Sequence, residues 1–129
     1  MILHLDTHVV AWLFAGDRAR FPARAQAALD HGRLVYSPVV RLELAFLREI
    51  GRITEEPVRI LDYLRDRIGL TPDATPHLVA VRAAESLAWT RDPFDRLITG
   101  AAAAGGHPLL TRDRAIRSHY ENAVWDDAV

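Results

Sequence analysis

The sequence predicts an α/β fold in which helices cover a parallel β-sheet. Short apolar segments alternate along the chain with longer segments of helical periodicity, a pattern typical of parallel sheets. The 129 residues suit one compact domain, which we expect to span residues 1–129. Half of the residues are hydrophobic, so the chain has enough apolar side chains to form a core without crosslinks.

The predicted strands are short and mostly apolar. We expect strands at residues 2–6, 33–36 and 108–111. Residues 70–72 and 123–125 are two shorter candidates, and they leave the number of strands open by one.

Helical patterns fill the segments between these strands. Most begin or end at a residue that favours a helix terminus, such as the capping pair Ser37-Pro38, Thr54 or Gly69. The expected helices are residues 7–15, 22–31, 37–51, 54–69, 75–88, 92–104 and 113–118.

Composition narrows the functional classes. The chain has no cysteine, which excludes disulfides, zinc–thiolate sites and thiol catalysis. We find neither a signal peptide nor an apolar run near the roughly 20 residues that cross a bilayer, so we expect a cytoplasmic protein. The net charge of −1 argues against binding nucleic acid through bulk charge. All 16 basic residues are arginine, a bidentate phosphate ligand, although a GC-rich genome also explains this usage.

Two aspartates follow predicted strands that lie far apart in the sequence. Asp6 ends the first strand, and Asp113 comes two residues after the strand at 108–111. Because ligand sites in open α/β sheets form beyond the carboxyl ends of the strands, both carboxylates are candidate site residues. The alternative is that each aspartate only caps the helix that follows it.

Glu43 lies within the apolar face of its predicted helix, which it shares with Val39, Val40, Phe46 and Leu47. Burying a carboxylate there is costly unless a cation compensates its charge, so Glu43 is a candidate metal ligand. The alternative is that its head group reaches solvent or an arginine.

Two further aspartates open the helix at 92–104. Asp92 is first of all a helix cap and second an outer metal ligand. Asp95 lies in the first turn, where the helix dipole alone would also favour an anion. With Asp6, Glu43 and Asp113, Asp95 would complete an all-oxygen site that suits Mg²⁺ or Mn²⁺ and the hydrolysis of phosphodiesters.

These residues lie in four strings that resemble PIN-domain ribonucleases, and in particular the VapC toxins of toxin–antitoxin pairs. The strings are LDTHVVAWL at 5–13, SPVVRLEL at 37–44, TRDPFDRLI at 90–98 and LLTRD at 109–113. The resemblance spans nearly the whole chain and implies a three-layer α/β/α fold with a parallel sheet of four or five strands. It also implies a Mg²⁺- or Mn²⁺-dependent endoribonuclease that leaves 5′-phosphate and 3′-hydroxyl ends.

The resemblance also assigns residues and partners. The acidic positions of the family fall on Asp6, Glu43, Asp95 and Asp113, with Asp92 as an additional acidic residue. Thr111 would place a hydroxyl near the metal. A VapB-like antitoxin would wrap the helices near the first strand and block the site, often with an arginine, and homodimers are common. The chain departs from the family at Thr99-Gly100, where glycine weakens the helix by up to about 1 kcal/mol relative to alanine.

Histidines and arginines near the acidic residues could have structural or functional roles. We expect His4 to be a core histidine with its hydrogen bonds satisfied and His8 to be structural. Arg91, Arg96 and Arg112 would either hold phosphates or balance the carboxylates.

A phosphatase that forms an aspartyl-phosphate would need an acid where His8 stands, and a lysine; a receiver domain also needs the lysine. A non-catalytic module that binds RNA or protein is the second function class. The sequence does not indicate which RNA is cut or how many metal ions bind.

Overall fold

The protein, in a computed structural model that describes residues 1–126, contains a parallel sheet. The strands are β1 (Ile2–Leu5), β2 (Arg33–Tyr36), β3 (Thr71–Pro72), β4 (Leu109–Leu110) and β5 (Ala123–Val124). They lie in the order β3-β2-β1-β4-β5, and every neighbouring pair is parallel. Both shorter candidates are therefore strands, and the described sheet has five.

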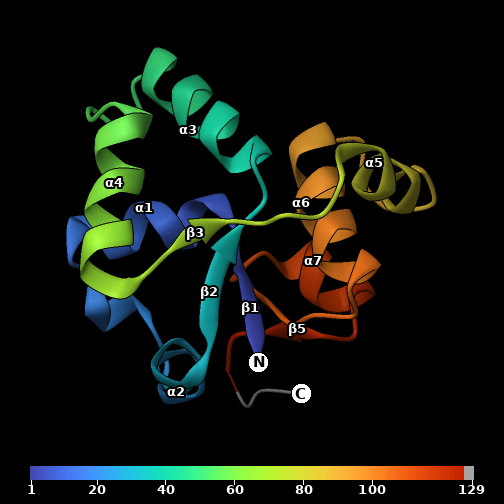
Figure 1. Cartoon of the computed structure of the whole chain (residues 1–129), viewed down its shortest axis with the longest axis horizontal. Helices are drawn as coiled ribbons and strands as arrows, with labels where there is room; N and C mark the ends of the chain where they lie inside the picture. The colour runs from blue at the N-terminus through green and yellow to red at the C-terminus, as the bar shows by residue number, and fades with distance from the viewer. Residues whose placement is uncertain (127–129) are drawn as a thin grey trace.

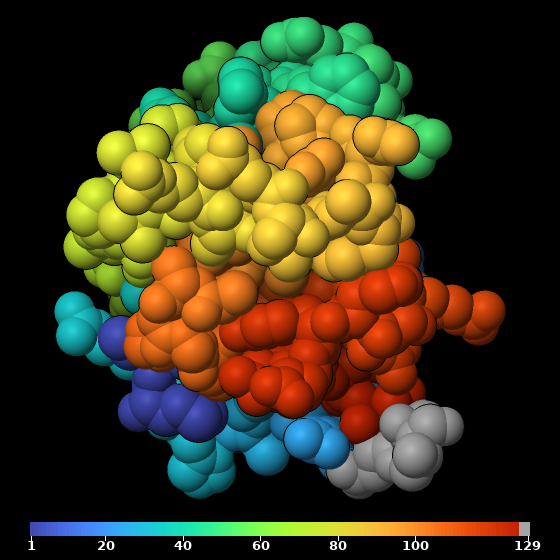
Figure 2. Space-filling model, turned by 90° about the vertical axis from the view of Figure 1, so that its right-hand side faces the viewer, coloured from blue at the N-terminus to red at the C-terminus, as the bar shows by residue number. Residues whose placement is uncertain are grey.

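Helices cover both faces of the sheet, which confirms the predicted three-layer α/β/α fold (Figure 1). The helices are α1 (Thr7–Ala15), α2 (Ala23–His31), α3 (Val39–Glu49), α4 (Pro57–Ile68), α5 (His77–Glu85), α6 (Pro93–Ala104) and α7 (Arg114–His119). α1, α2 and α4 lie on one side, and α5, α6 and α7 on the other, while α3 lies beyond the carboxyl ends of β1 and β2 (Figure 1). Figure 2 shows the second side, which the C-terminal half of the chain mostly forms.

The core is centred on β1, because this strand pairs with β2 on one edge and β4 on the other. Leu3 and Leu5 of β1 and Leu109 and Leu110 of β4 are fully buried. Strands covered on both faces carry continuous apolar residues, which explains why these segments do not alternate with polar positions.

The strand order reverses between β1 and β4. The chain first adds β2 and β3 to one edge of β1, and then returns to add β4 and β5 to the other edge. At such a reversal, the connections leave the two strands on opposite faces of the sheet and open a crevice at their carboxyl ends. The residues after Leu5 and after Leu110 therefore occupy the usual position of a ligand site.

Several helix starts differ from the prediction, and proline explains the difference. α4 begins at Pro57 with Glu56 as its N-cap, not at Thr54. Pro57 fits the first helical position, where no N–H is needed, and it holds Glu56 in an extended conformation. Pro38, not the Ser37 hydroxyl, occupies the N-cap of α3. The first strand ends at Leu5, one residue earlier than predicted, because Asp6 is the N-cap of α1.

A short 3₁₀-helix at Arg18–Arg20 was not predicted. It spans only three residues, too few to show a hydrophobic period. Among residues 1–126, no helix is long and apolar enough to cross a membrane.

Gly100 allows α6 to pack tightly against α5, which gives the Thr99-Gly100 departure a structural reason. A Cβ atom at Gly100 would lie 2.9 Å from the carbonyl oxygen of Ala80 and 2.9 Å from the amide nitrogen of Ala84. The backbones of the two helices therefore approach to a distance that only glycine permits.

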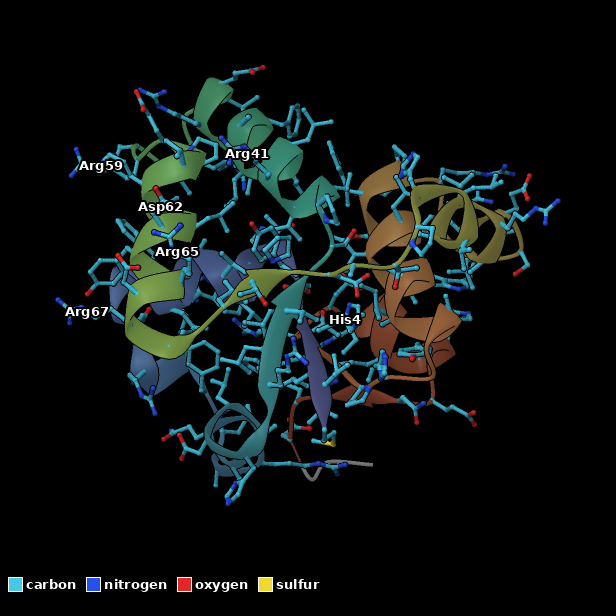
Figure 3. The ribbon with its side chains drawn as sticks, viewed as in Figure 1. His4, Arg41, Arg59, Asp62, Arg65 and Arg67 are labelled. Atoms are coloured by element: carbon cyan, nitrogen blue, oxygen red, sulfur yellow. The ribbon has the colours of Figure 1, made fainter. Side chains whose placement is uncertain are left out.

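His4 is buried, as expected, but its hydrogen bonds are not satisfied, so this part of the prediction is wrong. Neither ring nitrogen has a hydrogen-bond partner within the described chain, although Nε2 lies 3.9 Å from Oδ1 of Asp73. The ring stacks on His107 at 5.6 Å between centroids, on the side of β1 that faces α6 and α7 (Figure 3). Burial lowers the pKa of His4, which favours the neutral ring.

Candidate metal centre

Asp6 is held at the end of β1 by two hydrogen bonds. Its Oδ1 accepts from the backbone N–H of Val9 at 3.1 Å, which makes Asp6 the N-cap of α1. Its Oδ2 accepts a hydrogen bond from the hydroxyl of Thr111. Burial raises the pKa of Asp6, and the two hydrogen bonds oppose that rise. Asp6 is therefore both a cap and a carboxylate fixed at the reversal of strand order.

Glu43 projects from α3 and is only 8% exposed. Its Oε1 accepts a hydrogen bond from the hydroxyl of Thr7, the first residue of α1. Among residues 1–126, no arginine forms an ion pair with Glu43, so the alternative contact with an arginine is not formed. Burial raises the pKa of Glu43, and the Thr7 hydrogen bond counteracts part of this rise.

The two aspartates of α6 have different roles. Asp92 is the N-cap, and its Oδ1 accepts from the backbone N–H of Phe94 at 2.8 Å. Asp95, in the first turn, receives no such hydrogen bond at its carboxylate within the described residues. Burial raises the pKa of Asp95 to about 7, helped by the charges of Asp92, Asp113, Glu43 and Asp6 in that order. The carboxylates from all these segments therefore lie close enough to repel one another.

Asp113 follows β4 and caps α7, where its Oδ1 accepts from the N–H of Ile116 at 2.9 Å. The backbone N–H of Asp113 in turn donates to the hydroxyl of Thr111 at 3.0 Å. Thr111 is fully buried and thus connects Asp113 to Asp6 through one oxygen atom. Both aspartates at the strand ends are helix caps, as the alternative interpretation held, and they also share one polar network.

The donor set suits a hard divalent cation. Every candidate side chain offers carboxylate oxygens, the ligands that Mg²⁺ and Mn²⁺ prefer. The raised pKa values of Asp6, Glu43 and Asp95 reflect burial and mutual repulsion, both of which a bound cation would offset. As placed, however, no three His, Asp or Glu side chains in residues 1–126 are arranged to hold an ion.

A surface cavity of about 250 Å³ opens beside the carboxylates. It is lined by Asp6, His8, Trp12, Arg112, Asp113 and Arg114. His8 is exposed, and its ring centroid lies 6.0 Å from that of Trp12. Of the candidate carboxylates, Asp6 and Asp113 line this cavity, which lies between α1 and the start of α7.

The three arginines near the acidic residues have different environments. Arg96 is structural, since it donates to the carbonyl oxygens of Ala84 at 3.2 Å and Glu85 at 2.9 Å. Arg112 forms no ion pair within the described part of the chain and lines the cavity. Arg91 is exposed and lines a different cavity, with Pro93 and Leu97.

Thr7 is the site residue that the sequence interpretation did not single out. Its hydroxyl contacts Glu43, which lies 36 residues away in the sequence. The available signal was a threonine directly after Asp6, but the start of a helix explains that threonine equally well. A hydroxyl beside a buried carboxylate reduces the cost of burying it.

Comparison with known proteins agrees with this geometry. Residues 3–122 match the PIN domain family, so the chain belongs to that family. Within it, the chain is 32% identical over 122 residues to Ribonuclease VapC22 of Mycobacterium tuberculosis, and the match covers 89% of both proteins. The chain is therefore a VapC-type PIN-domain protein, as its four sequence strings indicated.

A solved structure supports the fold. The chain resembles a chain from the crystal structure of VapBC2 from Rickettsia felis bound to a DNA fragment from their promoter. The TM-score is 0.67, and the match covers 98% of both chains at 15% sequence identity. The same α/β/α arrangement is thus formed by two sequences that share few residues.

Proposed function

We propose that this protein is a Mg²⁺- or Mn²⁺-dependent endoribonuclease and the toxin of a toxin–antitoxin pair. In this proposal the whole chain is one nuclease domain that acts in the cytoplasm. Asp6, Glu43, Asp95 and Asp113 would hold the metal, with Asp92 as an outer ligand. Membership of the PIN-domain family and similarity to Ribonuclease VapC22 support the activity.

One observation carries the assignment of the site. Burial, together with carboxylates from four separate segments, raises the pKa of Asp95 to about 7, and these carboxylates lie where the strand order reverses. A folded protein keeps such repulsion when the carboxylates serve a cation or a proton transfer. Structural caps alone would explain Asp92 and Asp113, but not the buried Glu43 or Asp95 without a cation.

In the proposed reaction, the metal would supply the chemistry and the side chains of the protein would hold and orient its ligands. A bound divalent cation would acidify a water molecule and stabilise the charge that develops on the phosphodiester. The hydrogen bonds from Thr111 and Val9 would orient Asp6, and that from Thr7 would orient Glu43. Attack by water on phosphorus with departure of the 3′ oxygen would leave a 5′-phosphate and a 3′-hydroxyl.

Two protein partners belong to the proposal, a VapB-like antitoxin and a second copy of this chain in a homodimer. Apolar side chains that a partner could bury are exposed on α3, at its C-cap and on α5. These are Leu42, Phe46, Ile50, Leu78 and Val79. An antitoxin placed over α3 would lie beside the carboxylates and block access to them.

The test is cleavage of total cellular RNA by the purified chain, freed of antitoxin, with Mg²⁺ or Mn²⁺ and with EDTA. We expect discrete fragments that require the metal and that disappear in Asp95→Asn. The matched control is Asp66→Asn, because Asp66 is an exposed residue of α4 whose side chain forms an ion pair with the exposed Arg65. That control should cleave like the wild type.

The other outcomes also decide the question. Equal cleavage by wild type and Asp95→Asn would identify a contaminating nuclease and remove support for the site. If all variants are inert but bind RNA or an antitoxin, the protein is a binding module built on a nuclease fold.

A further inference from the structure

We propose that Trp12, Arg112 and Arg114 form a subsite that binds one nucleotide of single-stranded RNA beside the carboxylates. The inference rests on the proposed function, because it places the RNA chain relative to that site. In this subsite the base stacks on the indole ring of Trp12, while Arg112 and Arg114 hold the adjacent phosphate. It occupies the cavity of about 250 Å³ that reaches from Asp6 to Arg114.

The indole ring of Trp12 is fixed in place. It packs against the ring of Phe21 at 6.3 Å and against Trp125 at 6.1 Å between centroids, and both of these side chains are buried. Trp12 itself is only half-buried and lines the cavity. A rigid and partly exposed aromatic ring binds an unpaired base with little loss of side-chain entropy.

Cations already lie over this ring. The guanidinium carbon of Arg20 lies 5.0 Å from the Trp12 centroid, and that of Arg112 lies 5.9 Å away. Arg20 is also paired with Asp17 at 2.5 Å, whereas Arg112 forms no ion pair in residues 1–126. Because no ion pair in that range holds Arg112, its guanidinium can move from the ring to the phosphate in the proposed complex, and the base then takes its place over the indole.

Arg112 and Arg114 are held beside the carboxylates by their position in the sequence. Arg112 and Arg114 flank Asp113, whose side chain caps α7, so the backbone that carries all three residues is fixed. Arg114 is exposed and also forms no ion pair in the described chain. Two unpaired guanidinium groups next to the carboxylates offset the repulsion that RNA would otherwise meet in a chain of net charge −1.

These features favour single-stranded RNA over a duplex. A base can stack on Trp12 only if it has left its own helix, and paired bases do not present their faces. The subsite does not include the oxygens that would hold the metal, apart from those of Asp6 and Asp113 at its edge. Its loss should therefore weaken substrate binding and raise KM far more than it lowers kcat.

The experiment measures binding separately from cleavage. The probe is a fluorescein-labelled single-stranded RNA oligonucleotide, and its anisotropy is followed with Mg²⁺ in an Asp95→Asn background at several salt concentrations. We expect the pair Arg112→Gln and Arg114→Gln to weaken binding at least about tenfold. The slope of log K against log salt should fall by about 0.7 for each phosphate that the variant no longer neutralises.

The control variant is Arg59→Gln. Arg59 lies on the outer face of α4 and points away from the sheet (Figure 3), where it pairs with Glu55 at 3.4 Å. This variant should leave both the affinity and the salt slope unchanged. Trp12→Leu tests stacking, and Trp12→Phe, which keeps an aromatic face, controls for damage to the core. We expect Trp12→Phe to retain most of the affinity and Trp12→Leu to lose about tenfold.

The possible failures can be told apart. If Arg112→Gln with Arg114→Gln binds the oligonucleotide like Arg59→Gln, the subsite is wrong, whatever the chain cleaves. Binding of a duplex as tight as that of the single strand would also overturn it. If the wild type binds at Trp12 but never cleaves, the proposed function fails while the subsite stands.

Discussion

The hydroxyl of Thr111 lies between two carboxylate residues, donating a hydrogen bond to Asp6 and accepting one from the backbone N–H of Asp113. Because Thr111 is fully buried, no solvent can replace these hydrogen bonds when the hydroxyl is removed. We predict that Thr111→Val, which keeps the shape of the side chain, weakens Mn²⁺ binding and RNA cleavage by about 10- to 100-fold. Thr111→Ser should keep most of both activities. Calorimetric titration with Mn²⁺ checks the prediction, and an unchanged affinity in Thr111→Val would contradict it.

The raised pKa of Asp95 predicts how the stability of the metal-free protein depends on pH. With a folded pKa of about 7 and an ordinary value of 3.8, the folded chain keeps a proton on Asp95 that the unfolded chain loses. The contribution of this group to the free energy of unfolding therefore decreases as pH rises through this window and is smallest above about pH 7. In EDTA, Asp95→Asn should raise Tm by a few degrees at pH 8 and by roughly half as much at pH 5.5.

That comparison uses the difference between two proteins at each pH, so other titrating groups cancel. Thermal unfolding followed by circular dichroism is sufficient to measure it. An equal change in Tm at both pH values would show that Asp95 does not titrate in this range.

Metal should bind more tightly as pH rises. Protons and Mg²⁺ compete for the same carboxylate oxygens, and the pKa values of Asp6, Glu43 and Asp95 are all raised. At a concentration about 100 times the dissociation constant, a ligand of the folded state adds about 2.7 kcal/mol to the free energy of unfolding. We predict that Mn²⁺ raises Tm more at pH 8 than at pH 5.5, and that EDTA reverses the increase. Asp66→Asn should respond like the wild type, and Glu43→Gln should respond less.

Replacing Gly100 with alanine should destabilise the protein although alanine is the better helix former. The added Cβ would lie 2.9 Å from backbone atoms of both Ala80 and Ala84, which cannot move without shifting α5. Overpacking of this kind costs about 1–3 kcal/mol and outweighs the gain of up to about 1 kcal/mol in helix propensity. Urea unfolding measures the change. A variant as stable as the wild type would mean that α5 and α6 adjust freely.

The order and type of the described strands and α-helices followed from local patterns, since buried strands and amphipathic helices have distinct periods. The exact starts of α3 and α4 did not, because Ser37 and Thr54 are good caps in isolation, whereas Pro38 and Pro57 fix where each helix begins. The pairing of β1 with both β2 and β4 depends on contacts between distant segments that no local pattern encodes.

The acidic residues of the candidate site were predicted, but the hydrogen bond that Thr7 donates to one of them was not. Asp6, Glu43, Asp95 and Asp113 are recognisable because charge stands at strand ends or on apolar faces. The hydrogen bond from Thr7 to Glu43 joins two helices, so it becomes visible only once the helices are packed. His4 shows the opposite case, since its position in a strand predicts burial but not that its ring nitrogens lack partners.

The position of β4 in the sheet also bears on the synthesis of the protein. A ribosome releases β1 first and Leu109–Leu110 far later, yet β1 needs β4 to complete its pairing. Until then the growing chain exposes one open edge of its central strand, which is a surface for chaperones or for aggregation. In the same interval it carries Asp6, Glu43 and Asp95 without Asp113. A nascent chain therefore lacks the complete set of carboxylates until Asp113 has been synthesised. The proposed nuclease site cannot assemble while most of the chain is still being made on the ribosome.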